Sequence, residues 1–250
     1  MKLTSSSWNE LENLVLVAGH AVYVGVSPSA ASQDESWIIK HFQKGEAPHY
    51  IAHIRFGVEL AASMPSALLV FSGGQTRLEA GPWSEAQSYW QLAEQFDWWS
   101  KTEVRCRATT EEYARDSFEN LLLGIARFRE SCGHYPLSID IVGWDFKRRR
   151  FDFHRQTIKW PVTDLRYRYH GINNPDRIDI SEKREEMTMA SFRSDPFGNG
   201  KCILNKRAER NPFRRQSPYA VSCPEIASLL SYQASEGQEL RCHLPWESRP

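Results

Sequence analysis

The chain has 250 residues, of which 41% are hydrophobic, and its 31 basic and 31 acidic side chains cancel. This length and composition are ordinary for a single α/β domain with a sizeable core. A net charge of zero excludes a global field that would draw the protein to nucleic acid or to an anionic membrane. Any binding site for an anion must therefore be local.

The sequence lacks the signals of secretion, membrane insertion and metal binding. Its five cysteines are scattered without a CxxC pair, which favours reduced thiols over disulfides or a zinc site. It has no HxH or HExxH motif, so no metal is expected. No apolar run approaches the roughly 20 residues that span a bilayer, and the N-terminal sequence MKLTSSSWNELEN is unlike a secretory signal. We therefore expect a cytoplasmic protein, with the nucleus open to it, that has no membrane or nucleic-acid partner.

Short apolar runs predict the strands of a sheet. The runs at residues 14–17, 67–71 and 137–142 are typical of strands that are buried on both faces, as in the middle of a parallel sheet. Residues 104–107 and 165–169 are weaker strand candidates.

Segments with helical periodicity alternate with these strands. Residues 50–63 carry apolar side chains at helical spacing and stop before a proline, and Ser84 is the predicted N-cap of the next helix. Residues 113–130 have the strongest amphipathic pattern, and a basic helix is predicted near residues 146–159. This alternation predicts an α/β fold of the Rossmann-like type, a parallel sheet with helices on both faces.

Beyond this series the pattern weakens. Residues 173–176 and 195–198 are turn-like, and only residues 226–232 have the pattern of a further helix. We therefore expect one domain over residues 1–172, with residues 173–250 as an irregular C-terminal extension packed on it.

Ligands of open parallel sheets bind at the carboxyl ends of the strands, where this sequence has unusual segments. After the second strand comes Ser72-Gly73-Gly74-Gln75-Thr76-Arg77. Its glycines allow backbone N–H groups to approach a ligand, and Arg77 can pair with negative charge. It is neither a Walker A loop nor a GxGxxG motif. A tight turn without a ligand is the alternative interpretation.

A dense run of polar residues, 112–120, precedes the strongest helix. Asp116 or Ser117 can cap that helix, so capping alone is one interpretation. Arg115 does not fit it, because a cation opposes the dipole at a helix N-terminus. We expect a carboxylate, Glu85 or Glu112, or the anion of a ligand to compensate Arg115.

The segment after the third strand is basic. Lys147 and Arg150 are three apart and share one helical face, which is expected to point with the end of the strand. A solvated basic face is the alternative. His20 follows the first strand directly, so it is either a structural histidine or an acid–base group.

These segments, in this order, resemble the ElyC/SanA/YdcF-like family, a domain of unknown function. The matching residues are Arg55 on the first helix, Ser72-Gly73-Gly74, Ser84-Glu85-Ala86, the stretch from Glu112 to Asn120, and Lys147 with Arg150. The resemblance covers about residues 12–160. Fungal-type members are the most similar, because they share a VAGH start, an FKRRRF segment and a tail with DPFG, KR and RNPF.

The resemblance implies a Rossmann-like fold. Some bacterial members of the family are linked to S-adenosylmethionine binding and others to envelope functions, but no general activity is established. Lys147 stands where the family has a histidine, which removes a group that both donates and accepts protons near neutral pH. The envelope roles do not carry over, because the sequence has no membrane segment.

The leading hypothesis is an enzyme or cofactor-binding protein that holds an anionic small molecule, such as a nucleotide or an S-adenosylmethionine-like ligand. Its candidate ligand-binding residues are Gly19, Arg55, Ser72, Gly73, Gly74, Gln75, Arg77, Arg115, Asp116, Ser117, Asn120, Lys147 and Arg150. His20 and Glu85 are the candidate catalytic acid–base groups. The alternative is a non-catalytic regulatory or protein-interaction module, with Trp98, Trp99 and residues 210–215 as contact surfaces.

Overall fold

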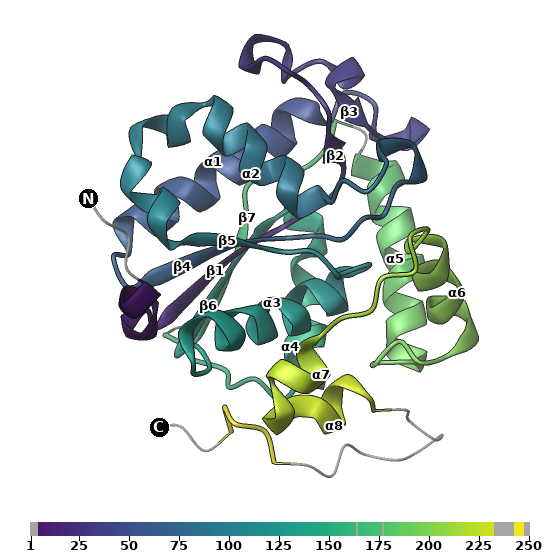
Figure 1. The fold of residues 1–250 in the computed structure, drawn as a ribbon. Coiled ribbons are helices and arrows are strands. Elements are labelled where there is room, and N and C mark those ends of the chain that lie inside the picture. The colour runs from purple at the N-terminus through teal and green to yellow at the C-terminus, as the bar shows by residue number, and fades with distance from the viewer. Residues whose placement is uncertain (1–4, 164, 177, 233–242, 248–250) are drawn as a thin grey trace.

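The computed structural model describes residues 5–163, 165–176, 178–232 and 243–247. Five strands form an all-parallel sheet in the order β5-β4-β1-β6-β7 (Figure 1). They are β1 (Asn13–Ala18), β4 (Ala67–Ser72), β5 (Ala108–Glu111), β6 (Ser138–Gly143) and β7 (Tyr167–Gly171). The short strands β2 (Val22–Tyr23) and β3 (Trp37–Ile38) form a separate antiparallel pair. The predicted α/β class with a parallel sheet is confirmed.

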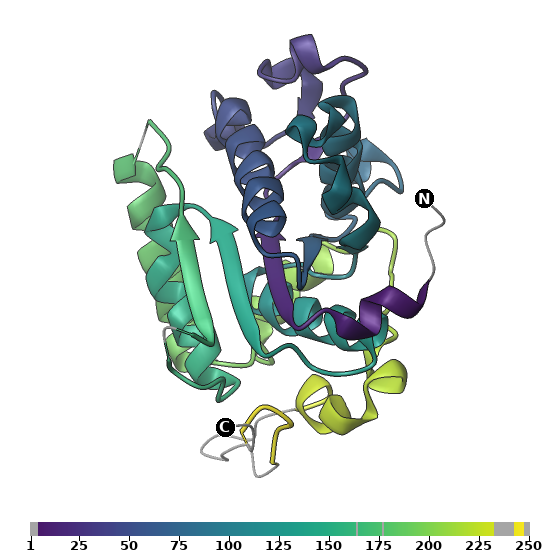
Figure 2. The same cartoon turned by 90° about the vertical axis from the view of Figure 1, so that its left-hand side faces the viewer.

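Helices cover both faces of the sheet. They are α1 (Ala47–Ser63), α2 (Glu85–Gln95), α3 (Ser117–Cys132) and α4 (Arg148–Thr157), followed by α5 (Ile178–Ser194), α6 (Lys201–Glu209), α7 (Tyr219–Ser222) and α8 (Ala227–Leu230). Helices α1 and α2 pack on one face, and α3 and α4 on the other (Figure 2). The core is therefore split into two layers by the sheet.

The central strand β1 shows why both layers are tight. Leu16 faces the α3 layer and Val17 faces the α1 layer, as the two-residue period of a strand requires. Gly124 of α3 lies against Leu16, and Gly57 of α1 lies against Val17, so closely that a Cβ on either glycine would overlap the facing side chain. Helices α1 and α3 thus pack tightly against β1 from both faces, and this packing fixes the position of the end of the strand.

Local signals set two helix starts beside the site. Ser84 caps α2, because its Oγ accepts the N–H of Gln87 at 2.9 Å, as predicted. Asp116 caps α3 through an N–H···O bond of 3.0 Å from Glu119. Because the cap is Asp116, α3 begins later than the predicted residue 113, and residues 113–116 form a loop.

The prediction of a strand at residues 104–107 is wrong. This segment is part of a 3-10 turn (Thr102–Arg107), and β5 begins at Ala108. Arg107 explains the difference, because its guanidinium donates to the carbonyl oxygens of Ala61, Met64 and Ala67 at 2.6–3.1 Å. The segment is thereby tied to the end of α1 and the start of β4.

Residues 178–209 contain two helices that the sequence pattern did not predict, α5 and α6. They lie side by side at one end of the molecule (Figure 1). Phe192 of α5 and Ile203 of α6 join the core cluster of the α3 layer. The buried positions of α5 are only Glu185, Met189 and Phe192, and this narrow stripe explains the weak periodicity.

None of the helices in the described part of the chain combines the length and the apolar character needed to cross a bilayer. Cys106, Cys132, Cys202 and Cys223 are free thiols, and Cys242 lies outside the described residues. Within the same residues, no three His, Cys, Asp or Glu side chains are grouped as metal ligands would be.

Candidate functional site

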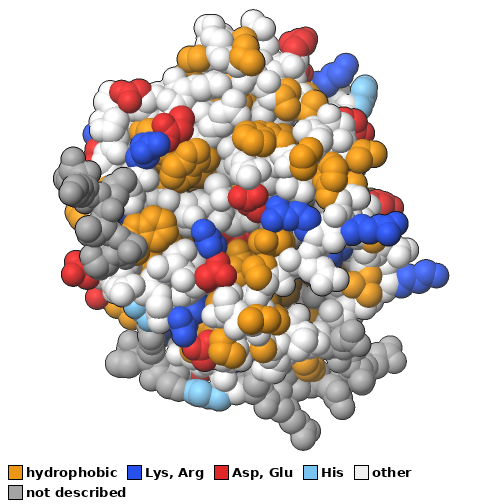
Figure 3. Space-filling model, viewed as in Figure 1, with side chains coloured by type: hydrophobic (Ala, Val, Ile, Leu, Met, Phe, Trp, Pro, Cys, Tyr) orange, Lys and Arg blue, Asp and Glu red, His pale blue; other side chains and the backbone are white. Residues whose placement is uncertain are grey.

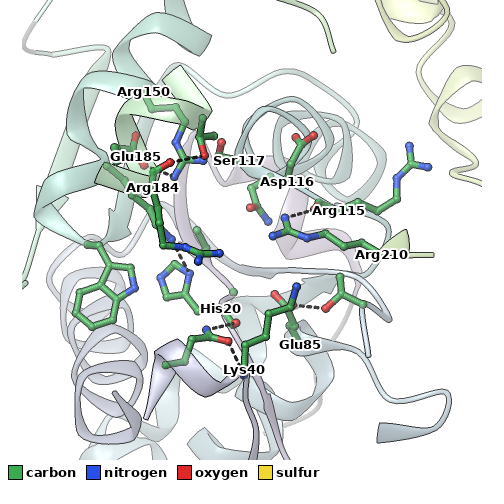
Figure 4. A pocket seen from close by; sticks show the side chains of 18 of the residues that line it. His20, Lys40, Glu85, Arg115, Asp116, Ser117, Arg150, Arg184, Glu185 and Arg210 are labelled. Atoms are coloured by element: carbon green, nitrogen blue, oxygen red, sulfur yellow. Dashed lines mark hydrogen bonds and ion pairs between the residues drawn. The ribbon is translucent and has the colours of Figure 1, made fainter. Parts of the chain in front are cut away.

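A cleft opens at the carboxyl ends of β1 and β6, where the order of the strands reverses (Figure 4). The chain runs from β1 outward to β4 and β5, and then returns to place β6 and β7 on the other side of β1. Loops that leave such a switch point diverge and form a crevice. The predicted residues that line the cleft are Gly19, His20, Arg77, Glu85, Arg115, Asp116, Ser117, Asn120, Lys147 and Arg150.

His20 and Lys147 face each other across this switch point. His20 follows β1, Lys147 follows β6, and Lys147 Nζ lies 3.3 Å from His20 Nδ1. The backbone of His20 is fixed on both sides, by an N–H bond to the Tyr89 hydroxyl and by a Gln43 amide bond to its carbonyl. Burial, and then the charge of Lys147, lowers the pKa of His20 well below its usual value. Burial and the neighbouring Arg150 lower the pKa of Lys147 to about 7.

The wall formed by α4 and α5 carries a buried ion pair. Arg150 Nη2 lies 2.8 Å from Glu185 Oε2, and each side chain is only 10% exposed. Arg150 Nε has no hydrogen-bond partner among the described residues. Ser117, at the start of α3, borders the same wall and places its Oγ 2.8 Å from Nε2 of the buried His154.

The C-terminal helices supply three further cations that were not predicted as ligand-binding residues, although residues 210–215 were expected as a contact surface. Arg184 of α5, Lys206 of α6 and Arg210 directly after α6 all line the cleft. Figure 4 shows the guanidinium groups of Arg184 and Arg210 entering it from opposite sides. Arg184 stacks over the ring of Phe42, 3.8 Å from its centre, and Arg210 Nη1 donates to the carbonyl of Arg115 at 2.8 Å. The i, i+4 spacing of Lys206 and Arg210 was a usable signal, but only once α6 is known to be a helix.

The charges of the cleft do not balance. Its basic residues are Lys40, Arg77, Arg115, Lys147, Arg150, Arg184, Lys206 and Arg210, and its acidic residues are Glu46, Glu85, Asp116 and Glu185. Among the described residues, six of these cations have no carboxylate within 4.0 Å, namely Lys40, Arg77, Lys147, Arg184, Lys206 and Arg210. The outer surface mixes both signs, although basic side chains gather over α6 (Figure 3). The cation excess is thus local, as a net charge of zero requires.

Crowding and burial change the acidity of these cations. Burial and the charge of Arg210 lower the pKa of Lys206 to about 8. The pKa of Lys40 is lowered by burial and by Arg77. Burial also lowers the pKa of Arg210. Each of these shifts has the sign expected of a cation held without a counter-charge.

The predicted glycine loop, residues 72–75, lies behind the cleft and does not line it. The N–H of Gly73 donates to the carbonyl of Glu111 at 2.9 Å, and that of Gly74 to the carbonyl of Ala114 at 2.7 Å. A Cβ on Gly74 would come 2.8 Å from the same Ala114 oxygen. The structure thus differs from the prediction that these N–H groups bind a ligand, because the protein's own carbonyls already occupy them.

Ser72, Gln75 and Asn120 make internal bonds. Ser72 Oγ donates to Glu111 Oε2 at 2.7 Å and accepts from the Asn120 amide at 2.9 Å. Burial raises the pKa of Glu111 to about 7. Gln75 donates to the carbonyl of Pro82 at 2.9 Å. The bonds of Ser72 join β4, β5 and α3.

The two arginines predicted from the first half of the chain have different positions. Arg55 lies outside the cleft on the exposed face of α1, where its Nε is 2.7 Å from Glu59. Its predicted ligand-binding role therefore does not agree with its position. Arg77 does line the cleft, donates to Gln43 at 3.3 Å, and leaves its Nε without a partner among the described residues.

Glu85 lines the cleft from the first turn of α2. Its carboxylate accepts a hydrogen bond from the hydroxyl of Thr76. A Cβ on Gly19 would come 2.6 Å from Glu85 Oε2, so the glycine after β1 makes room for this carboxylate. Glu85 is thereby held at the cleft, next to the strand that carries His20.

Arg115 is compensated differently from the prediction. Its guanidinium forms a two-point pair with Glu119, with N···O distances of 2.9 and 2.5 Å. Neither Glu85 nor Glu112 is its partner. Figure 4 shows this side chain directed away from the cleft, so its paired guanidinium adds no free cation to the site. The i, i+4 spacing of Arg115 and Glu119 was the signal that would have found the pair.

The carboxylates of Asp116 and Glu119, at the start of α3, also pair with an arginine of α6. Arg207 Nε lies 2.7 Å from Asp116 Oδ2 and 3.3 Å from Glu119 Oε1. Arg207 lowers the pKa of Asp116 to about 2 against the opposing effect of burial. We call Arg115, Asp116, Glu119 and Arg207 the α3 ion-pair network. It fastens the C-terminal helices beside the cleft.

The contact surfaces expected of an interaction module are only partly present. Trp98 is 1% exposed and packs in the α1 layer, and Trp99 stacks on Phe96. Arg210 points into the cleft. Neither Trp98 nor Arg210 therefore contributes to an outer contact surface.

Comparison with known proteins gives one relative. The chain is similar to an uncharacterized protein of Saccharomyces cerevisiae, with 28% identity over 96% of this chain and 99% of the yeast protein. No protein-family model and no solved structure matches the chain. The similarity thus extends over nearly the whole of both chains. Because the yeast protein is uncharacterized, the similarity indicates no activity for this chain.

Proposed function

We propose that the cleft binds a small molecule through a phosphate or carboxylate group. The observation that carries the proposal is the convergence of six cations that have no carboxylate within 4.0 Å among the described residues. They come from the segment between β3 and α1, from the loops after β4 and β6, and from α5 and α6 with its end. Like charges in a partly desolvated site repel one another. A bound anion would remove that repulsion and accept charge-assisted hydrogen bonds from the arginines.

The size and charge of the cleft favour particular ligands. Its volume of about 180 Å³ is below the roughly 300–1,000 Å³ that encloses a drug-sized molecule. The cleft would therefore enclose the anionic end of a ligand and leave the remainder nearer to solvent. The cations favour a nucleotide or sugar phosphate over S-adenosylmethionine, whose sulfonium is positive. The resemblance to the ElyC/SanA/YdcF-like family also supports a nucleoside derivative.

A thermal-shift screen of inorganic phosphate, nucleotides, sugar phosphates and S-adenosylmethionine tests this proposal. A ligand at 100 times its Kd adds about 2.7 kcal/mol of stability. Arg210→Met should weaken binding of the best anion about 10- to 150-fold, because hydrogen bonds to charged groups contribute about 1.5–3 kcal/mol. Arg193→Met is the matched control, since Arg193 is exposed on α5 and does not line the cleft. Equal affinity in both variants would refute the proposed site.

A further inference from the structure

Lys147 has an environment that none of the other cations of the cleft shares. Its Nζ contacts an imidazole nitrogen, His20 Nδ1, instead of a carboxylate. The side chain is half-buried and lines the cleft. Lys40 is exposed by comparison. The amine of Lys147 is thus both held in place and open to a ligand.

We propose that Lys147 is a reactive amine that forms an imine with an aldehyde or ketone bearing a phosphate or carboxylate group. The inference rests on the proposed function, because the neighbouring cations would hold the anionic group. Arg150 lies one helical turn beyond Lys147, and Arg210 and Lys206 reach the same cleft from α6 and its end. A carbonyl compound anchored there presents its reacting carbon within one small cavity that also contains the amine.

Imine formation needs only Lys147, His20 and the carbonyl compound. The lone pair of neutral Lys147 attacks the carbonyl carbon, a C–N bond forms, and the C–O π pair moves to oxygen. One N–H proton passes through His20 Nδ1 to that oxygen and gives a carbinolamine. The second N–H proton passes by the same route to the hydroxyl group, which departs as water as the C=N bond forms. No oxidant, reductant or metal takes part. His20 can accept the proton, because its lowered pKa keeps the imidazole neutral at pH 7.

A lysine amine attacks only when it is neutral. The pKa of Lys147 is lowered to about 7 by burial and by Arg150, whereas an ordinary lysine near 10.4 is less than about 0.1% neutral at pH 7. The charged groups that act on Lys147 are Arg150 of α4, Glu185 of α5, Glu46 before α1 and Arg210 after α6, and the neutral imidazole of His20 contacts its amine. Two of these are carboxylates, but neither lies within 4.0 Å of Nζ in the described structure.

The test uses pyridoxal 5′-phosphate as an anionic aldehyde, with borohydride reduction and peptide mapping of the wild-type protein. Reduction converts an imine to a stable secondary amine. At low reagent concentration and pH 7, Lys147 should be labelled at least tenfold faster than the exposed Lys44, with half-maximal labelling near pH 7. Pyridoxal without the phosphate should label Lys147 at least tenfold more slowly. Lys206→Met removes a neighbouring cation of the cleft but keeps the amine of Lys147, so it serves as the matched cleft variant.

Two outcomes separate this inference from the proposed function. If pyridoxal 5′-phosphate binds, as measured by a thermal shift, and Lys147 is labelled no faster than Lys44, the reactive amine is refuted and the anion site stands. If neither binding nor selective labelling occurs, both proposals are contradicted. Preferential labelling of Lys206 in the wild-type protein would also overturn the assignment of Lys147.

Discussion

Two groups of charged residues meet at the start of α3, and they differ in how their charges are compensated. In the α3 ion-pair network, Arg115 and Arg207 both lie within hydrogen-bond distance of carboxylates. In the cleft beside it, Arg210 and Lys206 have no carboxylate within 4.0 Å in the described structure. All four are basic residues around α3 and α6. Their roles therefore depend on the counter-charge that the fold provides and cannot be read from residue type.

The difference has an energetic meaning. Removal of one partner from a buried ion pair leaves an uncompensated charge, so the network should matter for folding. A cation without a partner adds repulsion to the folded state, so the cleft should cost stability until an anion binds. We expect substitutions in the two groups to have opposite effects on the free energy of unfolding.

The largest effect is expected for Arg207→Met. It leaves the buried carboxylate of Asp116 without its arginine, while Glu119 keeps only Arg115, and should lower the free energy of unfolding by about 3–5 kcal/mol. Urea denaturation measures this loss. Arg129→Met is the control, because its pair with Glu225 is surface-exposed and should contribute at most about 1 kcal/mol. Equal losses in the two variants would contradict the distinction between the groups.

As the pH falls, the stability contributed by the buried histidines should be lost before that contributed by the α3 ion-pair network. Burial lowers the pKa of His53 and of His154 to about 3, against about 6.5 when unfolded. The unfolded state binds more protons below pH 6.5, so the stability is fully present above 6.5 and is lost as pH falls. From pH 7 to 5 each histidine should cost about 2 kcal/mol. Asp116, with a pKa of about 2, keeps its contribution until the pH falls below about 3.8.

Urea unfolding at pH 7 and pH 5 measures this dependence. His154→Leu should reduce the pH-dependent loss by about 2 kcal/mol, whatever its effect on absolute stability. His41→Gln should leave the loss unchanged, because His41 is exposed. An unaltered pH dependence in His154→Leu would show that this histidine is not held neutral.

The smallest effect has the opposite sign. Lys206→Met removes a cation crowded by Arg210 and Arg150, and should raise the free energy of unfolding by about 0.5–1 kcal/mol without ligand. Saturating inorganic phosphate should stabilise the wild type more than the variant and reverse the order. Lys183→Met, on the exposed face of α5, is the control that should change neither value. Destabilisation of Lys206→Met without ligand would contradict the view that this cation lacks compensation.

Much of the fold could be predicted because its signals are local. The alternation of apolar strands with amphipathic helices specifies the parallel sheet, and the edge at which its strands end follows from that topology. His20, Lys147 and Arg150 were predicted correctly to lie at this edge, since His20 comes just after β1 and the segment that carries Lys147 and Arg150 comes after β6. The cap of α3, Asp116, was one of the two predicted, but the amphipathic pattern began four residues too early, because Tyr113 before the helix also packs against the core.

The sequence by itself determined the layers of this protein and the ends of β1 and β6, because strand and helix periods arise between neighbours along the backbone. Only the tertiary structure decided how the charges are shared. Asp116 and Arg207 are 91 residues apart in the chain, so no local pattern shows that they pair. Arg210 is likewise far in sequence from His20 and Lys147, with which it lines the cleft. Such long-range contacts decide whether a basic side chain stabilises the fold or is available to bind an anion, because they determine whether a carboxylate lies next to it.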